Sequence, residues 1–434
     1  MNQFAGYRCS LCGAEYSSTE ITYTCPKDGG NLDVMLDYDA IRQKVQVEDL
    51  LLSAEPGLWK YLPLLPVGDP GGRGTALRMA GGTPVLALDR LGAQLGLKHL
   101  WVKDESRNPS ASFKDRASSV VVARAREIGA EVVVTASTGN AGAALACMAA
   151  AVSQKAIIFA PRTAPQAKIA QLLIFGAQVL LVDGSYDDAF DLAIQAAHEF
   201  GWYCRNTGYN PFTAEGKKTA ALEIWEWWLR LTGVEVKDRF LRPAPLSTSP
   251  VAFTDHSPLN IFIPVGDGNI ISGIHKGFKD LATLGWIEQT PRIFGVQAEG
   301  SAAIANAFNA GSETIQPVSA STLADSISVD LPRDGVRAVR AVRETGGKYL
   351  LVSDGEILAA MAELGCVGLF AEPAGAAAYA GLVKAVAQGL VRTDDPVLVL
   401  NTGSGLKDVK AAMQAVTEAP VIEPTLAALR RVIK

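Results

Sequence analysis

Residues 131–161 read EVVVTASTGNAGAALACMAAAVSQKAIIFAP, and this stretch decides the fold. The apolar run 131–137 predicts a strand, the small residues of 142–152 predict a helix, and AIIFAP at 156–161 predicts a second strand. Strands that are rich in Val and Ile and alternate with helices are typical of a parallel sheet buried on both faces. The stretch therefore predicts a β-α-β unit.

The alternation continues toward the C-terminus, which predicts an α/β protein with mostly parallel sheets. The further predicted elements are helix 164–176, strand 178–184, helix 187–200, strand 260–268, a helix to about 284, strand 292–297, strand 396–403 and a helix from 406 onward. Three stretches predict loops: the glycine-rich 67–84, the polar 310–331, and the proline-rich 240–258, which we interpret as a surface insertion.

Composition excludes several classes of protein. The chain has 434 residues, 48% of them hydrophobic, with a net charge of −5 and a pI near 5.6. This acidic balance disfavours nucleic acid as a partner. No apolar run reaches the roughly 18 residues of a membrane-spanning helix, and the start lacks a signal-peptide pattern. Six cysteines do not make a disulfide framework. We expect a cytoplasmic protein with no membrane partner.

A lysine and an asparagine lie at predicted element ends. Lys114, in NPSASFKDRA (108–117), begins a predicted helix, where a lysine of lowered pKa could form a Schiff base. The alternative is an exposed lysine in a first helical turn. Asn140 follows the strand 131–137 and offers an amide donor beyond the strand's carboxyl end. The alternative there is a helix cap, for which Ser137 or Thr138 would serve.

Two glycine-rich turns follow later strands. In PVGDGNIISGIHKGF (264–278), Gly266 and Gly268 would let the backbone approach an anion at a helix N-terminus, although a plain tight turn is the alternative. In LVLNTGSGLKD (398–408), Thr402 and Ser404 place hydroxyls at a strand end. An amine for an aldehyde, an amide for a ring hydroxyl, a phosphate site and a partner for a ring nitrogen are what pyridoxal phosphate needs.

These motifs resemble the fold-type-II pyridoxal-phosphate enzymes, relatives of the tryptophan synthase β subunit, and among them the threonine synthases. The supporting stretches are GGTPVLALDRL (81–91), WVKDESRNPSASFKDRA (101–117), YNPFTAEGKKTAALEIWE (209–226) and FAEPAGAAA (370–378). The resemblance implies two doubly wound α/β domains with the cofactor cleft between them. We assign 36–117 and 226–434 to the larger cofactor-binding domain and 118–225 to the smaller one. A homodimer is the default expectation.

The resemblance also implies the roles of individual residues. Lys114 would be the catalytic, Schiff-base lysine, Asn140 would bond the ring hydroxyl oxygen, and Thr402 would face the ring nitrogen. We call residues 266–270 the glycine turn; it would bind the cofactor phosphate through Gly266, Asp267, Gly268, Asn269 and Ile270. The residues predicted to bind substrate are Ser112, Arg116, Ser137 and Thr138.

The implied reaction is that of a lyase, which converts O-phospho-L-homoserine and water to L-threonine and phosphate. The substrate phosphate needs cations. The candidates are Arg116, ranked first because it lies near Lys114, and Lys103, Arg107 and Lys218. The alternative is a threonine or serine dehydratase or a β-replacement enzyme of the same superfamily. The chain departs from the threonine synthase pattern where it reads STGNAG (137–142), because a Thr-Ser pair usually follows the asparagine.

The N-terminus carries a cysteine pattern. Cys9, Cys12 and Cys25 are followed by Asp28, in CPKDGG, where the resembling family usually has a fourth cysteine. Three thiolates and one carboxylate are an allowed zinc set. We predict a zinc-ribbon-like segment over 1–35 with a structural role. Bound zinc and a ribbon-shaped hairpin without metal are both left open.

Overall fold

The computed structural model describes residues 3–20, 23–164, 166–233 and 258–433. The larger of its two parallel sheets has the strand order β12-β11-β10-β13-β5-β4, and only the β4–β5 pair is antiparallel. Its strands are β4 (Val85–Ala87), β5 (Leu100–Asp104), β10 (Asn260–Pro264), β11 (Arg292–Ala298), β12 (Tyr349–Val352) and β13 (Val397–Asn401).

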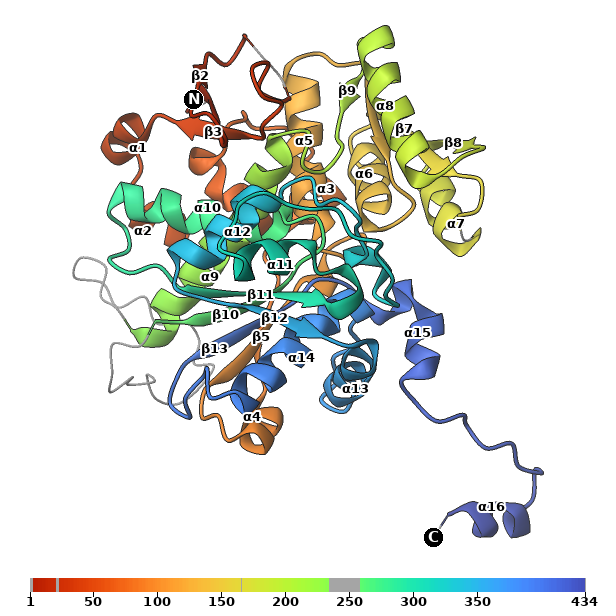
Figure 1. Ribbon diagram of the computed structural model, residues 1–434. Helices are drawn as coiled ribbons and strands as arrows, with labels where there is room; N and C mark the ends of the chain where they lie inside the picture. The colour runs from red at the N-terminus through yellow and green to blue at the C-terminus, as the bar shows by residue number, and fades with distance from the viewer. Residues whose placement is uncertain (1–2, 21–22, 165, 234–257, 434) are drawn as a thin grey trace.

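The smaller sheet is parallel throughout, with the order β8-β7-β6-β9. It is built around the quoted β-α-β unit and lies beside the larger sheet (Figure 1). Its strands and helices are β6 (Val132–Ala136), α6 (Asn140–Ala150), β7 (Lys155–Pro161), α7 (Gln166–Ile174), β8 (Gln178–Val182), α8 (Tyr186–Phe200) and β9 (Tyr203–Cys204). The predicted α/β fold with two mostly parallel sheets is confirmed.

Helices cover the larger sheet on both faces. They are α4 (Asp89–Leu95), α10 (Asn269–Leu284), α11 (Ala303–Asn309), α12 (Gly335–Glu344), α13 (Asp354–Gly365) and α14 (Pro373–Ala387). The helix predicted from 406 onward is instead a 3-10 turn, η5 (Gly405–Lys407), followed by the short α15 (Val409–Gln414). Asp408 explains the break, because its side chain caps a new helix by accepting from the Ala411 N–H.

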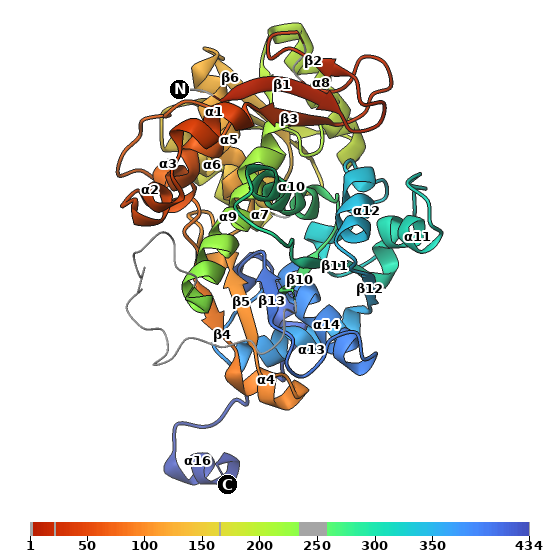
Figure 2. The same cartoon turned by 90° about the vertical axis from the view of Figure 1, so that its left-hand side faces the viewer.

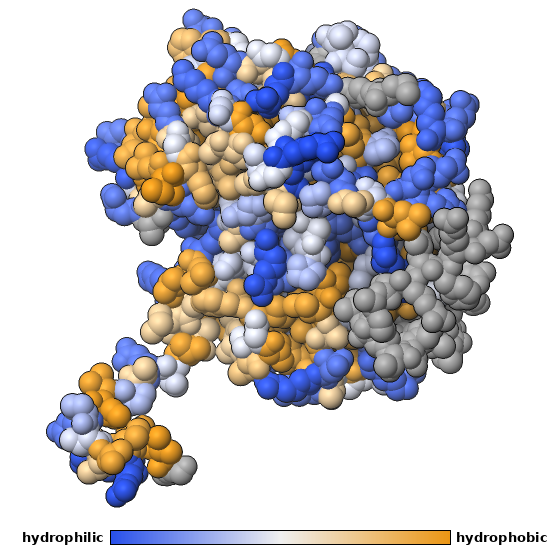
Figure 3. Space-filling view, turned by 180° about the vertical axis from the view of Figure 1, so that it is seen from behind, coloured by the Kyte–Doolittle hydropathy of each residue, from blue (hydrophilic) through white to orange (hydrophobic). Residues whose placement is uncertain are grey.

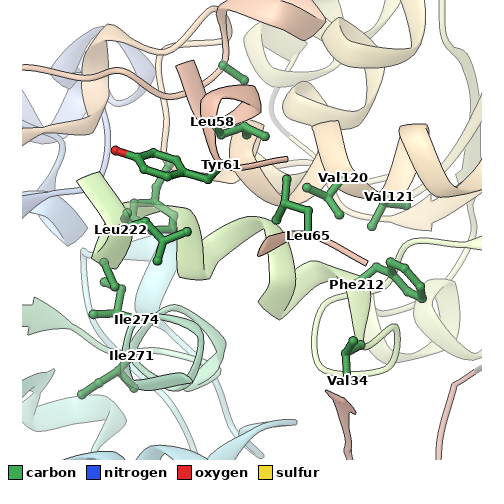
Figure 4. Packing of buried hydrophobic residues seen from close by; sticks show 14 of the residues in the cluster. Val34, Leu58, Tyr61, Leu65, Val120, Val121, Phe212, Leu222, Ile271 and Ile274 are labelled. Carbon is green, nitrogen blue, oxygen red and sulfur yellow. The ribbon is translucent and has the colours of Figure 1, made fainter. Parts of the chain in front are cut away.

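Two long helices, α5 (Lys114–Glu127) and α9 (Phe212–Thr232), pack against each other, and α9 also packs on α10. Figure 4 shows Val120 and Val121 of α5 on the side of Phe212 of α9, and Leu222 of α9 near Ile274 of α10. This apolar contact fixes the start of α5 relative to the start of α10. The predicted domain boundaries fall inside α5 and α9, and they stay a prediction.

The N-terminal segment is a small antiparallel sheet of order β2-β1-β3, with β1 (Phe4–Cys9), β2 (Glu15–Tyr16) and β3 (Leu32–Leu36). Figure 2 shows it lying across the top of the molecule. The chain then runs through α1 (Tyr38–Lys44), α2 (Val47–Leu52), η1 (Gly57–Leu64) and α3 (Ala76–Met79). Val34 of β3 belongs to the same apolar cluster as Phe212, so the sheet is packed onto the main body.

The C-terminal helix α16 (Leu426–Val432) stands away from the body in Figures 1 and 2. Its surface mixes apolar and charged residues, as Figure 3 shows. The predicted insertion 240–258 lies, except for its last residue, outside the described residues. Within the described ranges, every helix is too short or too polar to cross a membrane.

Candidate active site

Lys114 lies at the N-terminus of α5, directly beside the end of β13. The Phe113 N–H donates to the Thr402 carbonyl at 2.9 Å, and Ser112 bridges to Gly403. Lys114, Asn140, Thr402 and the glycine turn all line one cavity, which we call the inner cavity. The structure therefore brings together all the residues that were predicted to bind cofactor.

The environment of Lys114 makes its amine a base. Burial lowers the pKa of Lys114, and the positive charge of Arg205 lowers it further. Asp267 and Glu372 act in the opposite direction. An amine of lowered pKa is uncharged in a larger fraction of molecules, which suits it to attack an aldehyde and to accept a proton.

The glycine turn leads from β10 into the 16-residue α10. Gly268 has φ 86°, and a Cβ atom there would lie 2.6 Å from the Asp334 carbonyl oxygen, so the turn requires glycine. The first N–H groups of a helix have no partner within the helix and attract anions. A phosphate fits this turn.

Asp267 is a carboxylate inside the same turn. Its Oδ1 accepts from the Arg333 N–H at 3.2 Å. Burial raises the pKa of Asp267, an effect that this hydrogen bond, Lys114 and Lys217 oppose. A raised pKa brings the carboxyl closer to its neutral form, which would lessen its repulsion of a phosphate.

Asn269, the first residue of α10, is held from two sides. Its Oδ1 accepts from the Thr213 hydroxyl at 3.1 Å and from Lys217, while its Nδ2 donates to Asp334 at 2.7 Å. Arg337 pairs with Asp334 at 2.6 Å. The same guanidinium reaches Asp33 of β3 at 2.7 Å, so hydrogen bonds connect the N-terminal sheet with the glycine turn.

Lys217 is a buried lysine that the sequence reasoning missed. Burial places its pKa well below the usual value, and the charges of Lys114 and Arg205 lower it further. It lies on α9, and it was quoted only as part of a supporting stretch. Nothing local distinguishes it in the sequence from Lys218, which instead pairs with Asp280 at 2.8 Å.

A second, larger cavity of about 680 Å³ opens from Lys114, and we call it the outer cavity. Its volume is in the range of small-molecule sites. Ser137 and Thr138, both predicted to bind substrate, line it. Three further cations line it as well, and none of them was predicted: Lys168, Arg205 and Arg333. Arg205 donates to the Thr207 hydroxyl at 2.6 Å and to the Ser118 hydroxyl at 3.2 Å.

Arg116 lies outside both cavities, which contradicts its predicted contact with substrate. It is completely buried and donates to Glu105 at 2.7 Å and to Glu223 at 2.7 Å. Lys103 completes this group, which we call the Arg116 network, with a 2.7 Å bond to Glu223. Successive helix residues turn by about 100°, so Arg116 is about 200° around α5 from Lys114. When Lys114 faces the cavity, Arg116 faces away from it.

Four other residues that were predicted to bind the substrate or its phosphate also lie outside both cavities. Lys103 and Lys218 are buried in ion pairs, and the largely exposed Arg107 pairs with Asp104 at 3.0 Å. Ser112 is fully buried and lines neither the inner nor the outer cavity. Within the described part of the chain its hydroxyl has no hydrogen-bond partner. None of these residues is placed to touch a ligand in either cavity.

The four N-terminal candidates do come together. The ligand atoms of Cys9, Cys12, Cys25 and Asp28 all lie within 4.8 Å of one another. Asp28 Oδ1 is 3.3 Å from the Cys9 sulfur, and the Cys12 and Cys25 sulfurs are 3.8 Å apart. Three sulfur donors and one carboxylate in so small a volume fit a tetrahedral metal ion of the zinc type. Whether they bind one stays a prediction.

Comparison with known proteins places these features in a family. The family model described as "Pyridoxal-phosphate dependent enzyme" matches residues 77–403. The chain is 38% identical over 432 residues to "Threonine synthase" of Methanocaldococcus jannaschii, covering 98% of this chain and 99% of that protein. It is 37% identical over 429 residues to "Threonine synthase" of Methanosarcina acetivorans, covering 98% of each.

Solved structures share the fold at lower sequence identity. Threonine deaminase isoform 2 from Solanum lycopersicum aligns with a TM-score of 0.63 and 22% identity, over 84% of this chain and 96% of that one. Maize serine racemase aligns with a TM-score of 0.60 and 23% identity, over 77% and 91%. At this level of identity the likeness concerns the fold alone.

Proposed function

This chain belongs to the family of pyridoxal-phosphate-dependent enzymes, and on that basis we propose that it is a threonine synthase. It is a lyase that converts O-phospho-L-homoserine and water to L-threonine and phosphate. The observation that carries this choice within the family is the outer cavity. Three cations line this cavity: Lys168 pairs with Asp325 and Arg333 with Asp187, whereas Arg205 donates to hydroxyls and is the candidate for a second anion site beyond the glycine turn.

A dehydratase acting on threonine or serine needs no second anion site. The position of Arg205 in the outer cavity therefore favours the phosphorylated substrate. The same conclusion is supported by the named relatives, which match this chain over nearly its whole length. The departure at STGNAG (137–142) removes two hydroxyl-bearing residues from the substrate side, and the outer cavity retains Ser137 and Thr138.

The residues of the inner cavity hold the cofactor. The glycine turn would bind its phosphate, Asn140 would donate to the ring hydroxyl oxygen, and Thr402 would face the ring nitrogen; all of them line this cavity. When bound, pyridoxal phosphate supplies an aldehyde for the substrate amine and a ring that accepts electrons from Cα. Thr402 is a neutral hydroxyl, so it leaves the ring nitrogen less firmly protonated than a carboxylate would.

Lys114 moves the protons. Its amine would take a proton from the substrate Cα and transfer protons at Cβ, which its lowered pKa permits. Arg205 is the first candidate to hold the substrate phosphate, because it lines the outer cavity together with Lys114. Ser137 and Thr138 offer hydroxyls to the substrate at the start of α6.

One assay tests the proposal. Purified protein is incubated with pyridoxal phosphate and O-phosphohomoserine, and phosphate and threonine are measured. A parallel reaction contains threonine alone, and 2-oxobutyrate is measured there. Equal amounts of phosphate and threonine in the first reaction are expected. 2-Oxobutyrate from threonine, without phosphate release from phosphohomoserine, would favour the dehydratase.

We further propose that Cys9, Cys12, Cys25 and Asp28 hold a structural zinc ion. The site lies outside both cavities, so the ion takes no part in the chemistry. Metal analysis of protein purified without chelator is expected to find about one zinc per chain, and less in Cys25→Ser. A zinc content near zero in the unaltered protein would contradict the proposal.

We also propose that the protein is a homodimer and that it is cytoplasmic. The six cysteines, all of them in the described ranges, form no disulfide, which agrees with a reducing compartment. Light scattering on the full chain tests the oligomeric state, and a mass of one chain or of four would exclude a dimer.

A further inference from the structure

Glu372 lines the inner cavity and was quoted above only as part of a supporting stretch. It is 4% exposed and precedes α14 at the N-cap position, where a side-chain oxygen can accept from the first N–H groups of the helix. The Glu372 carboxylate makes no such bond. It turns away from α14 and accepts from Asn140 Nδ2 at 2.9 and 3.0 Å. Its orientation therefore serves Asn140 and not the helix that it precedes.

The backbone around Glu372 is fixed against the end of β13. The Glu372 N–H donates to the Gly403 carbonyl at 3.0 Å, and Ala371 forms a bridge with Ser404. A Cβ atom on Gly403 would lie 2.3 Å from Glu372 Oε1, so only glycine leaves room for the carboxylate. The carboxylate thus lies between the Asn140 amide and the loop that carries Thr402.

The Asn140 amide has two N–H donors and one oxygen, and its two edges have opposite polarity. The carboxylate of Glu372 can only accept when ionised, so it selects the NH₂ edge. A third contact of Nδ2, to the Ser326 hydroxyl, is 3.4 Å long and lies at the weak end of the hydrogen-bond range. Glu372 is the strong partner that decides which edge of Asn140 faces the cavity.

We propose that Glu372 is a positioning residue that holds the Asn140 amide in one orientation, with one N–H on the carboxylate and the other directed at the ring hydroxyl oxygen of the cofactor. This inference rests on the proposed role of Asn140, and it is independent of which amino acid is the substrate. Without the carboxylate, the amide can rotate and present its own oxygen to the ring oxygen. Repulsion between two acceptors then replaces a hydrogen bond.

A double-mutant cycle on cofactor binding, without substrate, tests the proposal. The variants are Glu372→Ala, Asn140→Ala and the two combined, and the readouts are the cofactor dissociation constant and the absorbance maximum of the bound cofactor. We expect Glu372→Ala to weaken binding about tenfold and to shift the maximum. The same substitution should change neither quantity in the Asn140→Ala background. Glu372→Gln keeps an acceptor oxygen and should restore most of the affinity.

Two outcomes would overturn the inference. One is a Glu372→Ala effect of equal size with and without Asn140. The other is an unchanged absorbance and affinity in Glu372→Ala. If the alanine variant does not fold, Glu372→Gln in both backgrounds gives the same decision, with an expected two- to threefold effect that vanishes without Asn140. Since no substrate is present, failure of the threonine synthase assay leaves this result intact.

Discussion

Lys114 of the inner cavity and Arg116 of the Arg116 network lie two residues apart on α5, yet their charges have opposite surroundings. In the network, Arg116 and Lys103 meet Glu105 and Glu223 at bond distance; Glu223 is partly buried and the other three are fully buried. In the cavity, Lys114 is an amine whose pKa burial lowers, beside other cations. Ion pairs between buried charges hold structural elements together. A buried lysine whose pKa is lowered is uncharged in more molecules, so its amine is available for chemistry.

Two of the buried arginines, Arg116 and Arg205, make the comparison sharper. Arg116 of α5 lies between Glu105, just after β5, and Glu223 of α9, and so ties those elements together. Arg205 donates to the hydroxyls of Ser118 and Thr207 and lines the outer cavity. Burial alone does not distinguish a structural arginine from a binding one. The two kinds of arginine are distinguished by the chemistry of their partners and by whether they line a cavity.

The largest expected effect is on the cavity side. Lys114→Ala removes the group that moves protons, so kcat should fall by about 10⁴-fold. The bound cofactor should also lose the absorbance that reports its link to the lysine. The exposed Lys98→Ala, in a surface pair with Asp394, is the control and should leave both unchanged. Retention of kcat within tenfold would remove Lys114 from the mechanism.

The next effect is on the network side. Arg116→Met keeps an apolar stem but leaves Glu105 and Glu223 without their main counter-charge. Breaking a buried pair in this way costs about 3–5 kcal/mol of the free energy of unfolding. Denaturant unfolding measures this loss, and KM for O-phosphohomoserine should remain within about twofold for the folded fraction. A large rise in KM with unchanged stability would return Arg116 to the substrate site.

The matched substitution at the outer cavity should give the reverse result. Arg205→Met removes a charged donor to the substrate phosphate, which is worth about 1.5–3 kcal/mol, or roughly 10- to 100-fold in kcat/KM, mainly through KM. Its loss of stability should be smaller than that of Arg116→Met, because Arg205 lines a cavity and donates to two hydroxyls, whereas Arg116 holds two carboxylates in the interior. Steady-state kinetics and unfolding on the same two variants decide the comparison. An unchanged KM in Arg205→Met would assign the substrate phosphate to another residue.

The same contrast shows how much the sequence could predict. The strands, the glycine turn and the placement of Lys114, Asn140 and Thr402 follow from local patterns, since the carboxyl ends of parallel strands meet at one edge. The choice between Arg116 and Arg205 as the residue that binds the substrate phosphate does not follow from local patterns. Closeness to Lys114 in the sequence does not show which way a side chain points. Helix periodicity was a signal that could have excluded Arg116.

The partners of Glu372 and Lys217 were beyond local reasoning. Glu372 meets Asn140 across 232 positions, and Lys217 meets Asn269 across 52. Such contacts depend on how α9 packs on α10 and on how α14 packs against the large sheet. Only the resemblance of the stretches that contain them hinted that they matter. The cysteine cluster was different, because its four ligands lie close together in the sequence.

The smallest expected effect concerns acid stability and again separates the two regions. Burial by itself would raise the pKa of Glu223, but Arg116 and Lys103 outweigh it and hold that pKa below the usual 4.5. A carboxyl with a lowered folded-state pKa contributes stability above about pH 4.5, and this is lost as pH falls below that value. One proton taken up on unfolding gives a slope of about 1.4 kcal/mol per pH unit.

Unfolding measured between pH 3 and pH 6 checks this slope. Glu223→Gln should be less stable near pH 6 and should lack the contribution of one proton to the slope below pH 4.5. The control is Glu15→Gln, which replaces an exposed carboxylate. This variant should keep the full slope, since the surface pair of Glu15 with Arg8 contributes little to stability. Equal slopes in Glu223→Gln and the unaltered protein would mean that folding does not change the pKa of Glu223. The Arg116 network would then no longer be a paired counterpart of the cavity.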